Sequence, residues 1–203
     1  MMAVKSEEGL RSRKKRLTRK RIAEASLRLY LRDGYDKTTM ASVAAEAGVS
    51  ARTLYLYFPT KEYTLRYWLE EDFYNRVPEI ITAQPVRDSP SDVAQRAILE
   101  VVEQRDAQHS ITMDRLTESS PALSEHKKAI LLQLEVQMAT ALCQLWPDPA
   151  MAAGLRRLSM MVIGAMRIGI ERWRNDGARL PISEYVRDEF SHLPGTIDTL
   201  VTT

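Results

Sequence analysis

The chain has 203 residues, a net charge of only +2, one cysteine, 8 glycines and 9 prolines. This composition favours helices, and it excludes a disulfide-stapled secreted protein, a low-complexity chain and a protein with a long apolar membrane span. One or two domains are expected, and the lone Cys143 fits a reducing, cytoplasmic location.

The small net charge hides a strong asymmetry along the chain. Residues 1–62 contain 14 Lys and Arg against 7 Asp and Glu, whereas residues 63–203 contain 15 against 20. Eight of the cations fall within residues 11–21. A basic N-terminal part joined to an acidic remainder indicates that only the N-terminal part contacts a polyanion.

The chain begins with a segment that lacks apolar periodicity, residues 1–12, which we expect to be a disordered leader. A first helix is predicted from Arg13 or Thr18 to Arg32, and Gly34 can end it in a left-handed conformation. Five residues at helical spacing form its predicted inward face: Ile22, Ala25, Ser26, Leu29 and Tyr30.

Two short helices separated by a sharp turn follow the first helix. Thr38 or Thr39 can cap a helix that ends near Glu46, and Ser50 can cap the next one. Gly48 can adopt the positive φ that the tight turn between them requires. This pattern is typical of a helix-turn-helix, whose second helix presents polar side chains to the major groove of DNA.

This segment resembles the DNA-binding domain of TetR-family transcriptional regulators. The resemblance is carried by uninterrupted spacing of Thr38-Thr39, Val43-Ala44, Ala47-Gly48-Val49-Ser50, Thr53-Leu54-Tyr55, Tyr57-Phe58 and Lys61-Glu62. It covers about residues 18–65 and implies a dimeric regulator that binds double-stranded DNA. The rest of the chain is similar to the family only in length and helical pattern, so the resemblance implies no particular ligand.

The residues expected to contact DNA come from the basic arm, the helix caps and the third helix: Arg13, Lys14, Lys15, Thr39, Ser50, Arg52, Thr53, Tyr55, Tyr57 and Lys61. By the resemblance, Tyr55 and Lys61 match positions that commonly hold phosphates, and Thr53 matches one that can reach bases. Arg52 is the only side chain of this helix that can donate twice to guanine O6 and N7. For Tyr55 the alternative is a packed ring, and for Thr39 it is a role as helix cap alone.

Two positions of the third helix depart from the family pattern. Leu56 stands where relatives frequently have a polar or aromatic residue, and it either contacts a thymine methyl group or packs within the protein. Ala51 offers only a methyl group to the groove. The operator sequence therefore stays open.

The remainder of the chain keeps a helical pattern. A long helix is predicted from Thr60 and weakens near Pro78, and further helices are predicted over residues 91–108, 112–119, 122–146, 149–175 and 182–193. The prediction is an all-α protein of about nine helices. It divides into the leader, a helix-turn-helix domain over residues 13–62 and a ligand-binding and dimerisation domain over residues 63–203.

The last two predicted helices carry apolar stripes, and no later segment of the sequence remains to cover the final one. We expect them to form a four-helix bundle with a second copy, the alternative being that both pack within one chain. The expected effector contacts are Tyr67, Phe73, Met113, Leu116, Met138, Leu142, Trp146, Met160, Met161 and Arg167. Arg167 is expected to be buried, with Glu135 or an anionic ligand group as its partner.

The predicted function is repression of transcription, relieved when a small apolar or amphipathic effector removes the protein from a palindromic operator. One alternative is a DNA-binding protein without a small-molecule ligand, and another is a small helical enzyme. Catalysis and metal or cofactor binding are not expected, because His109, His126 and His192 lie far apart and the chain has no Gly-rich phosphate loop.

Overall fold

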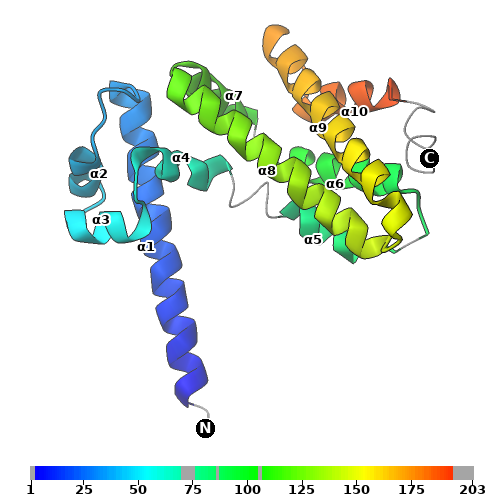
Figure 1. Ribbon diagram of the computed structural model, residues 1–203. Coiled ribbons are helices and arrows are strands. Elements are labelled where there is room, and N and C mark those ends of the chain that lie inside the picture. Colours follow the sequence, from blue (N-terminus) through cyan, green and yellow to red (C-terminus); the bar gives the residue numbers. More distant parts are fainter. Residues whose placement is uncertain (1–2, 70–75, 86, 105–106, 194–203) are drawn as a thin grey trace.

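A computed structural model describes residues 3–69, 76–85, 87–104 and 107–193 (Figure 1). The regular elements of these segments are α1 (Ala3–Asp33), α2 (Met40–Glu46), α3 (Ala51–Tyr57), α4 (Lys61–Leu69), α5 (Arg76–Ala83), α6 (Pro90–Glu103), α7 (Ala107–Glu118), α8 (Pro121–Leu145), the 3-10 turn η2 (Pro149–Met151), α9 (Ala152–Asn175) and α10 (Ile182–Ser191). The all-α prediction is confirmed. Within the described segments, no helix is both long and apolar enough to cross a membrane.

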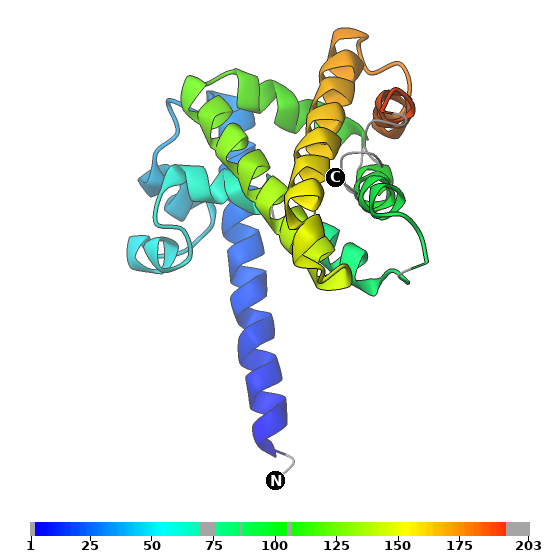
Figure 2. The ribbon, with the colours of Figure 1, turned by 45° about the vertical axis from the view of Figure 1, so that its right-hand side comes forward.

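The first helix is longer than predicted. It begins at Ala3, so residues 3–12 are helical, and the expectation of a disordered leader is wrong for them. The segment contains good helix formers and no proline, so nothing in it ends the helix. Its side chains over residues 11–17 are exposed, and this half of α1 projects away from the other helices (Figures 1 and 2).

Buried apolar residues form two clusters. One lies among α1, α2 and α3 and consists of Ile22, Ala23, Ala25, Leu29, Val43, Ala44, Ala47, Leu54 and Phe58. The other fills the body formed by α5 to α10 and includes Tyr30 and Tyr35 from the end of α1 and its loop, together with Leu65 of α4. The end of α1 and α4 therefore join the N-terminal domain to the body.

The apolar stripe of the last helix is covered within the chain, which corrects our prediction. Ile182, Tyr185, Val186 and Phe190 are buried, and α10 packs against α9 and α6. Gly169 of α9 allows this approach, because a Cβ atom there would lie 2.9 Å from the Cα atom of Val186.

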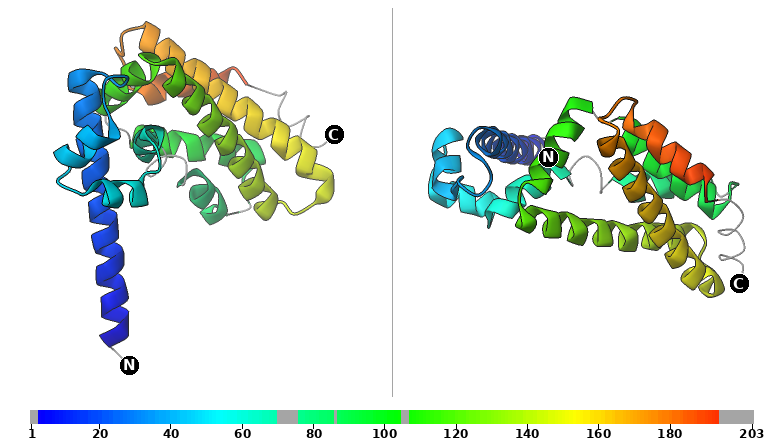
Figure 3. Two further views of the ribbon diagram at one scale, coloured as in Figure 1. Left: turned by 60° about the vertical axis from the view of Figure 1, so that its left-hand side comes forward. Right: turned by 90° about the horizontal axis from the view of Figure 1, so that it is seen from above.

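Exposed apolar side chains of the body gather instead on α8 and α9. Four of them are more than half exposed and define what we call the α8–α9 face: Leu132, Val136, Met160 and Ile168. The two helices diverge from their short connection, and α7 lies across the open end (Figure 3).

Candidate nucleic-acid interface

The two helices of the helix-turn-helix begin at the predicted caps. The Thr39 hydroxyl accepts a hydrogen bond from the Ser42 amide at 3.1 Å, and the Ser42 hydroxyl accepts one from the Thr39 amide at 3.1 Å. This reciprocal pair satisfies two amides at the start of α2. Ser50 caps α3 by accepting from the Thr53 amide at 3.1 Å, and Gly48 has the positive φ (+61°) that the turn needs.

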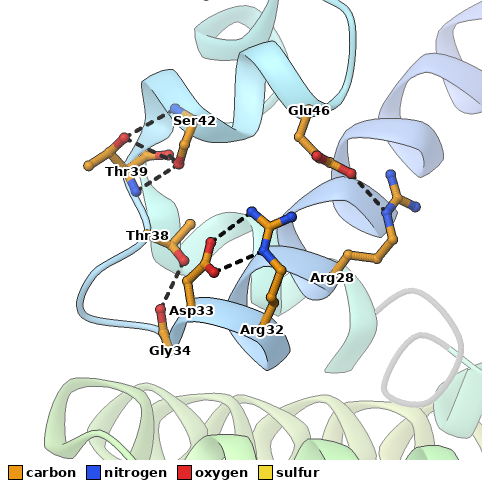
Figure 4. A network of polar contacts seen from close by, with 8 residues as sticks. All are labelled: Arg28, Arg32, Asp33, Gly34, Thr38, Thr39, Ser42 and Glu46. Atoms are coloured by element: carbon orange, nitrogen blue, oxygen red, sulfur yellow. Dashed lines mark hydrogen bonds and ion pairs between the residues drawn. The ribbon is translucent and has the colours of Figure 1, made fainter.

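Further polar contacts fix α2 against α1, as Figure 4 shows. The Arg28 guanidinium lies 3.2 Å from the Glu46 carboxylate at the far end of α2. In the connecting loop, the Thr38 hydroxyl donates to the Gly34 carbonyl at 2.9 Å, and Gly34 has a φ of +88°. The ion pair is exposed and contributes little energy by itself. The orientation of α2 is set mainly by the buried cluster beneath it.

The third helix is held by two buried residues and exposes the rest. Leu54 and Phe58 are buried in the first cluster. Arg52 is exposed, Tyr55 is 53% exposed and Leu56 is 80% exposed, so the Tyr55 ring is not a packed core ring. Thr53 and Tyr57 are half-buried beside this face. The helix therefore presents one cation, one phenol and one aliphatic group to the outside.

Lys61 holds the loop between α1 and α2 as well as standing at the start of α4. Its ammonium donates to the carbonyls of Tyr35 at 2.8 Å and Thr38 at 3.2 Å, and it lies 4.0 Å from the centre of the Tyr35 ring. An ammonium has three donors, so one is left for a phosphate oxygen. The predicted phosphate contact is thus joined to a positioning role that sequence reasoning missed.

Two tyrosines complete this junction and were also missed. The Tyr30 hydroxyl donates to the Lys61 carbonyl at 3.1 Å and shares a 2.6 Å hydrogen bond with Thr64. The Tyr35 hydroxyl donates to the Glu62 carboxylate at 2.9 Å. Burial raises the pKa of Tyr30 to about 12. The pKa of Tyr35 is raised too, mainly by burial and secondly by its hydrogen bond to the Glu62 carboxylate. Both phenols therefore remain protonated donors. The sequence feature that could have indicated this junction is a pair of tyrosines, each with an apolar ring and a polar hydroxyl, near the end of the inward face of the first helix.

The predicted basic arm lies on the projecting half of α1. Arg13, Lys14 and Lys15 are exposed there. Further along the same helix, the Arg19 guanidinium lies 5.6 Å from the centre of the Phe58 ring and 5.4 Å from that of Tyr67. Arg19 therefore links α1 to the end of α3 and to α4, while the cations of residues 11–16 are exposed to solvent.

The structure places the residues predicted to contact an effector in different surroundings. Tyr67 packs against the first cluster, and Phe73 lies outside the described residues. The others belong to the body: Met113, Leu116, Met138 and Leu142 are buried in its core, Trp146 and Met161 are half-buried, and Met160 is exposed.

The prediction of a buried Arg167 is wrong. Arg167 is exposed, and within the described part of the chain it forms no ion pair with Glu135 or another carboxylate. The inward face of α9 is set by Val162, Met166 and Gly169, and position 167 falls beyond that face. Apolar neighbours in sequence do not bury a residue when they stand on other faces of a helix.

Arg167 and Met113 do share one cleft, of about 490 Å³, between α7, α8, α9 and the start of α10. Its apolar wall includes Leu131, Met166 and Trp173. Its polar wall contains a triad in which nearly buried Asp114 accepts from Lys127 at 2.9 Å and pairs with Arg174 at 3.0 Å. Arg174 also pairs with Glu118, so two carboxylates match the two basic groups of the triad, whereas Arg167 forms no ion pair within the described part of the chain.

Comparison with known proteins gives the following similarities. Residues 22–63 match the family model of "Bacterial regulatory proteins, tetR family". The HTH-type transcriptional repressor KstR of Mycolicibacterium smegmatis is 42% identical over 72 residues, which are 36% of this chain and 35% of that protein. The chain thus spans about a third of the length of the curated relatives it matches.

Similar solved structures extend over nearly the whole chain. A TetR-family regulator from Syntrophomonas wolfei is 19% identical with a TM-score of 0.63, covering 93% of this chain and 96% of that one. FadR from Thermus thermophilus, in complex with lauroyl-CoA, is 20% identical with a TM-score of 0.54, covering 85% of this chain and 91% of that one. At these identities the similarity shows the fold.

Proposed function

We propose that this chain, a member of the tetR family by its residues 22–63, represses transcription as a homodimer on a palindromic operator and leaves it when an effector binds. The observation that carries the proposal is α3, a capped and firmly seated helix that presents Arg52, Tyr55 and Leu56 to the outside. The relatives are named regulators and repressors, which supports a regulator rather than an enzyme.

The residues proposed to bind DNA serve two purposes, sequence specificity and general affinity. Arg52 reads a base edge in the major groove, because its planar fork of donors matches guanine O6 and N7. Lys61, Tyr55 and the cations of α1 hold phosphates, which sets position and strengthens binding without sequence information. The acidic balance of residues 63–203 keeps the body away from the duplex.

Arg52→Ala is expected to relax operator preference at one base pair per half-site, by about 1–3 kcal/mol. The measurement is selection of an operator from randomised duplexes by the unaltered protein, followed by titration of single-base variants. Lys15→Ala is the matched control, and it should weaken all duplexes alike and reduce the salt slope by about one. Uniform weakening by Arg52→Ala would exclude base reading, and a wild-type protein without any preferred duplex would overturn the proposed function.

The exposed α8–α9 face supports a homodimer interface formed by these two helices of each copy. Three of its four large apolar side chains, Leu132, Val136 and Met160, border a shallow groove of about 520 Å³ that also contains Glu135 and Arg156. An isologous interface buries such a face against itself, so the acid of one copy can meet the base of the other. The proposed dimer interface therefore keeps α9, as the sequence predicted, but α8 takes the place of α10, whose apolar stripe is covered within the chain.

The cleft between α7, α8 and α9 supports an amphipathic effector with an anionic end. An apolar chain fits against Leu131, Met166 and Trp173, while exposed Arg167 offers a cation that no ion pair of the described residues engages. The likeness to FadR in complex with lauroyl-CoA, an acyl chain on an anionic carrier, agrees with this ligand class.

The same cleft is connected to the DNA-binding domain by packing. Met113 and Leu131 of the cleft belong to the buried cluster that contains Tyr30 and Leu65. A ligand that shifts these side chains therefore acts on α4, and Lys61 at the start of α4 holds the loop that precedes α2. A small rotation of α4 would change the spacing of the two recognition helices in a dimer.

Arg167→Met is expected to remove the preference for an anionic effector and to leave operator affinity unchanged when no effector is present. The probes are lauric acid and dodecanol, titrated against the protein on labelled operator. Lauric acid should release the wild-type protein from the operator at lower concentrations than dodecanol does. We expect a coupling free energy of about 1–3 kcal/mol between the two sites, and operator DNA should weaken ligand binding by the same amount. Arg179→Met, in the exposed connection before α10, is the control.

Two results would contradict this assignment of the effector site. A ligand that binds the body but leaves operator affinity unchanged would exclude the coupling. If neither probe changes operator binding or the unfolding temperature, the alternative of a regulator without such a ligand is favoured. Neither result affects the assignment of α3 to DNA.

A further inference from the structure

Leu56 is the most exposed large hydrophobic residue in the part of the chain that the structure describes, with 80% of its surface accessible. It stands in α3 between two residues that hold the helix in place, because Leu54 and Phe58 are both buried. The sequence left open whether Leu56 packs within the protein or reaches outward. Its exposure removes the first alternative.

The surroundings of Leu56 are those of a DNA-reading surface. Exposed Arg52 lies four residues earlier on the same helix, and exposed Tyr55 is its neighbour. Residues four apart stand on one face of a helix, with about 6 Å of rise between them. A groove that receives Arg52 therefore also passes beside Leu56.

We propose that Leu56 contacts the C5-methyl group of a thymine and thereby sets one base of each half-site. The thymine methyl is the apolar group that the major groove displays, so it is the feature that an aliphatic side chain can distinguish there. Because base pairs are spaced by about 3.4 Å, this thymine lies within about two base pairs of the guanine read by Arg52. The inference rests on the proposed function, DNA binding by α3.

The test removes the methyl group from the DNA and the leucine from the protein, separately and together. The duplex is the operator selected by the wild-type protein, with each thymine in turn replaced by deoxyuridine, which lacks only the methyl group. For the wild-type protein we expect a loss of about fourfold at one thymine of a half-site, which corresponds to about 0.8 kcal/mol for one methyl-sized group.

The variants decide whether Leu56 causes that loss. Leu56→Ala should weaken binding to the thymine duplex and become insensitive to deoxyuridine at that position, whereas Leu56→Met should keep the sensitivity. Leu31→Ala, which truncates an exposed leucine near the end of α1, should leave the sensitivity unchanged. Because 80% of the Leu56 surface is accessible, its truncation should also leave the unfolding temperature unchanged.

Three outcomes would overturn the inference, and they separate it from the proposed function. A wild-type protein insensitive to deoxyuridine at every position, on an operator that still depends on Arg52, excludes methyl reading while DNA binding stands. If the Leu56→Ala protein remains as sensitive to deoxyuridine as the wild type, another residue contacts the methyl group. A protein that prefers no duplex at all removes the proposed function together with this inference.

Discussion

Val136→Glu is expected to convert the proposed dimer into monomers and to lower operator affinity about a hundredfold or more. Val136 is 55% exposed on the α8–α9 face, where a carboxylate would lose its hydration on dimerisation without gaining a partner. A monomer carries one recognition helix, so it loses the gain in effective concentration that comes from holding two half-sites at once.

Leu180→Glu is the matched control for this substitution. Leu180 is 57% exposed but lies in the connection between α9 and α10, outside the α8–α9 face. Of the two variants, only Leu180→Glu should sediment as a dimer at micromolar concentration and bind the operator with full affinity. A Val136→Glu protein that remains dimeric would exclude α8 from the interface. A wild-type monomer with full affinity would exclude the dimer.

The helix-turn-helix could be predicted because its determinants are local. Thr39 and Ser50 cap helices through amides three residues ahead, and Gly48 supplies the turn by its own conformation. Signals of this kind are complete within a short stretch of sequence. The structure accordingly begins both helices at the predicted caps.

The contacts of Lys61 were only partly predictable, because they join segments far apart in the chain. Its position at the start of α4 follows from the sequence, and its contact with a phosphate is what the resemblance to the family implies. Its hydrogen bonds to the carbonyls of Tyr35 and Thr38 depend on how α4 packs against the end of α1. No spacing rule in a single sequence specifies that packing.

The errors in the body share a physical cause. The apolar stripe of α10 shows that the helix must be covered, but it does not say whether the cover comes from the same chain or from a second copy. Here α6 and α9 supply it. Arg167 was misjudged for a related reason, because its neighbours in sequence differ from its neighbours in space.

Gly169→Ala is expected to destabilise the body by about 3 kcal/mol, near the upper end of the cost of overpacking. The new Cβ atom would lie 2.9 Å from the Cα atom of Val186, 3.0 Å from its amide nitrogen and 3.0 Å from the Tyr185 carbonyl oxygen. All three are backbone atoms, which cannot rotate away as a side chain would. For a chain of this size the loss corresponds to a fall of about 6–12 °C in Tm.

Gly164→Ala tests whether this loss comes from the contact with α10. Gly164 lies on the same helix, and a Cβ atom there would meet nothing within 4 Å in one protomer. Removing a helical glycine should then raise stability by about 0.5–1 kcal/mol. Both variants are unfolded thermally at equal concentration, with the oligomeric state recorded. Equal stability of Gly169→Ala and the wild type would mean that α10 is not seated on α9, and its apolar stripe would again be available to a second copy.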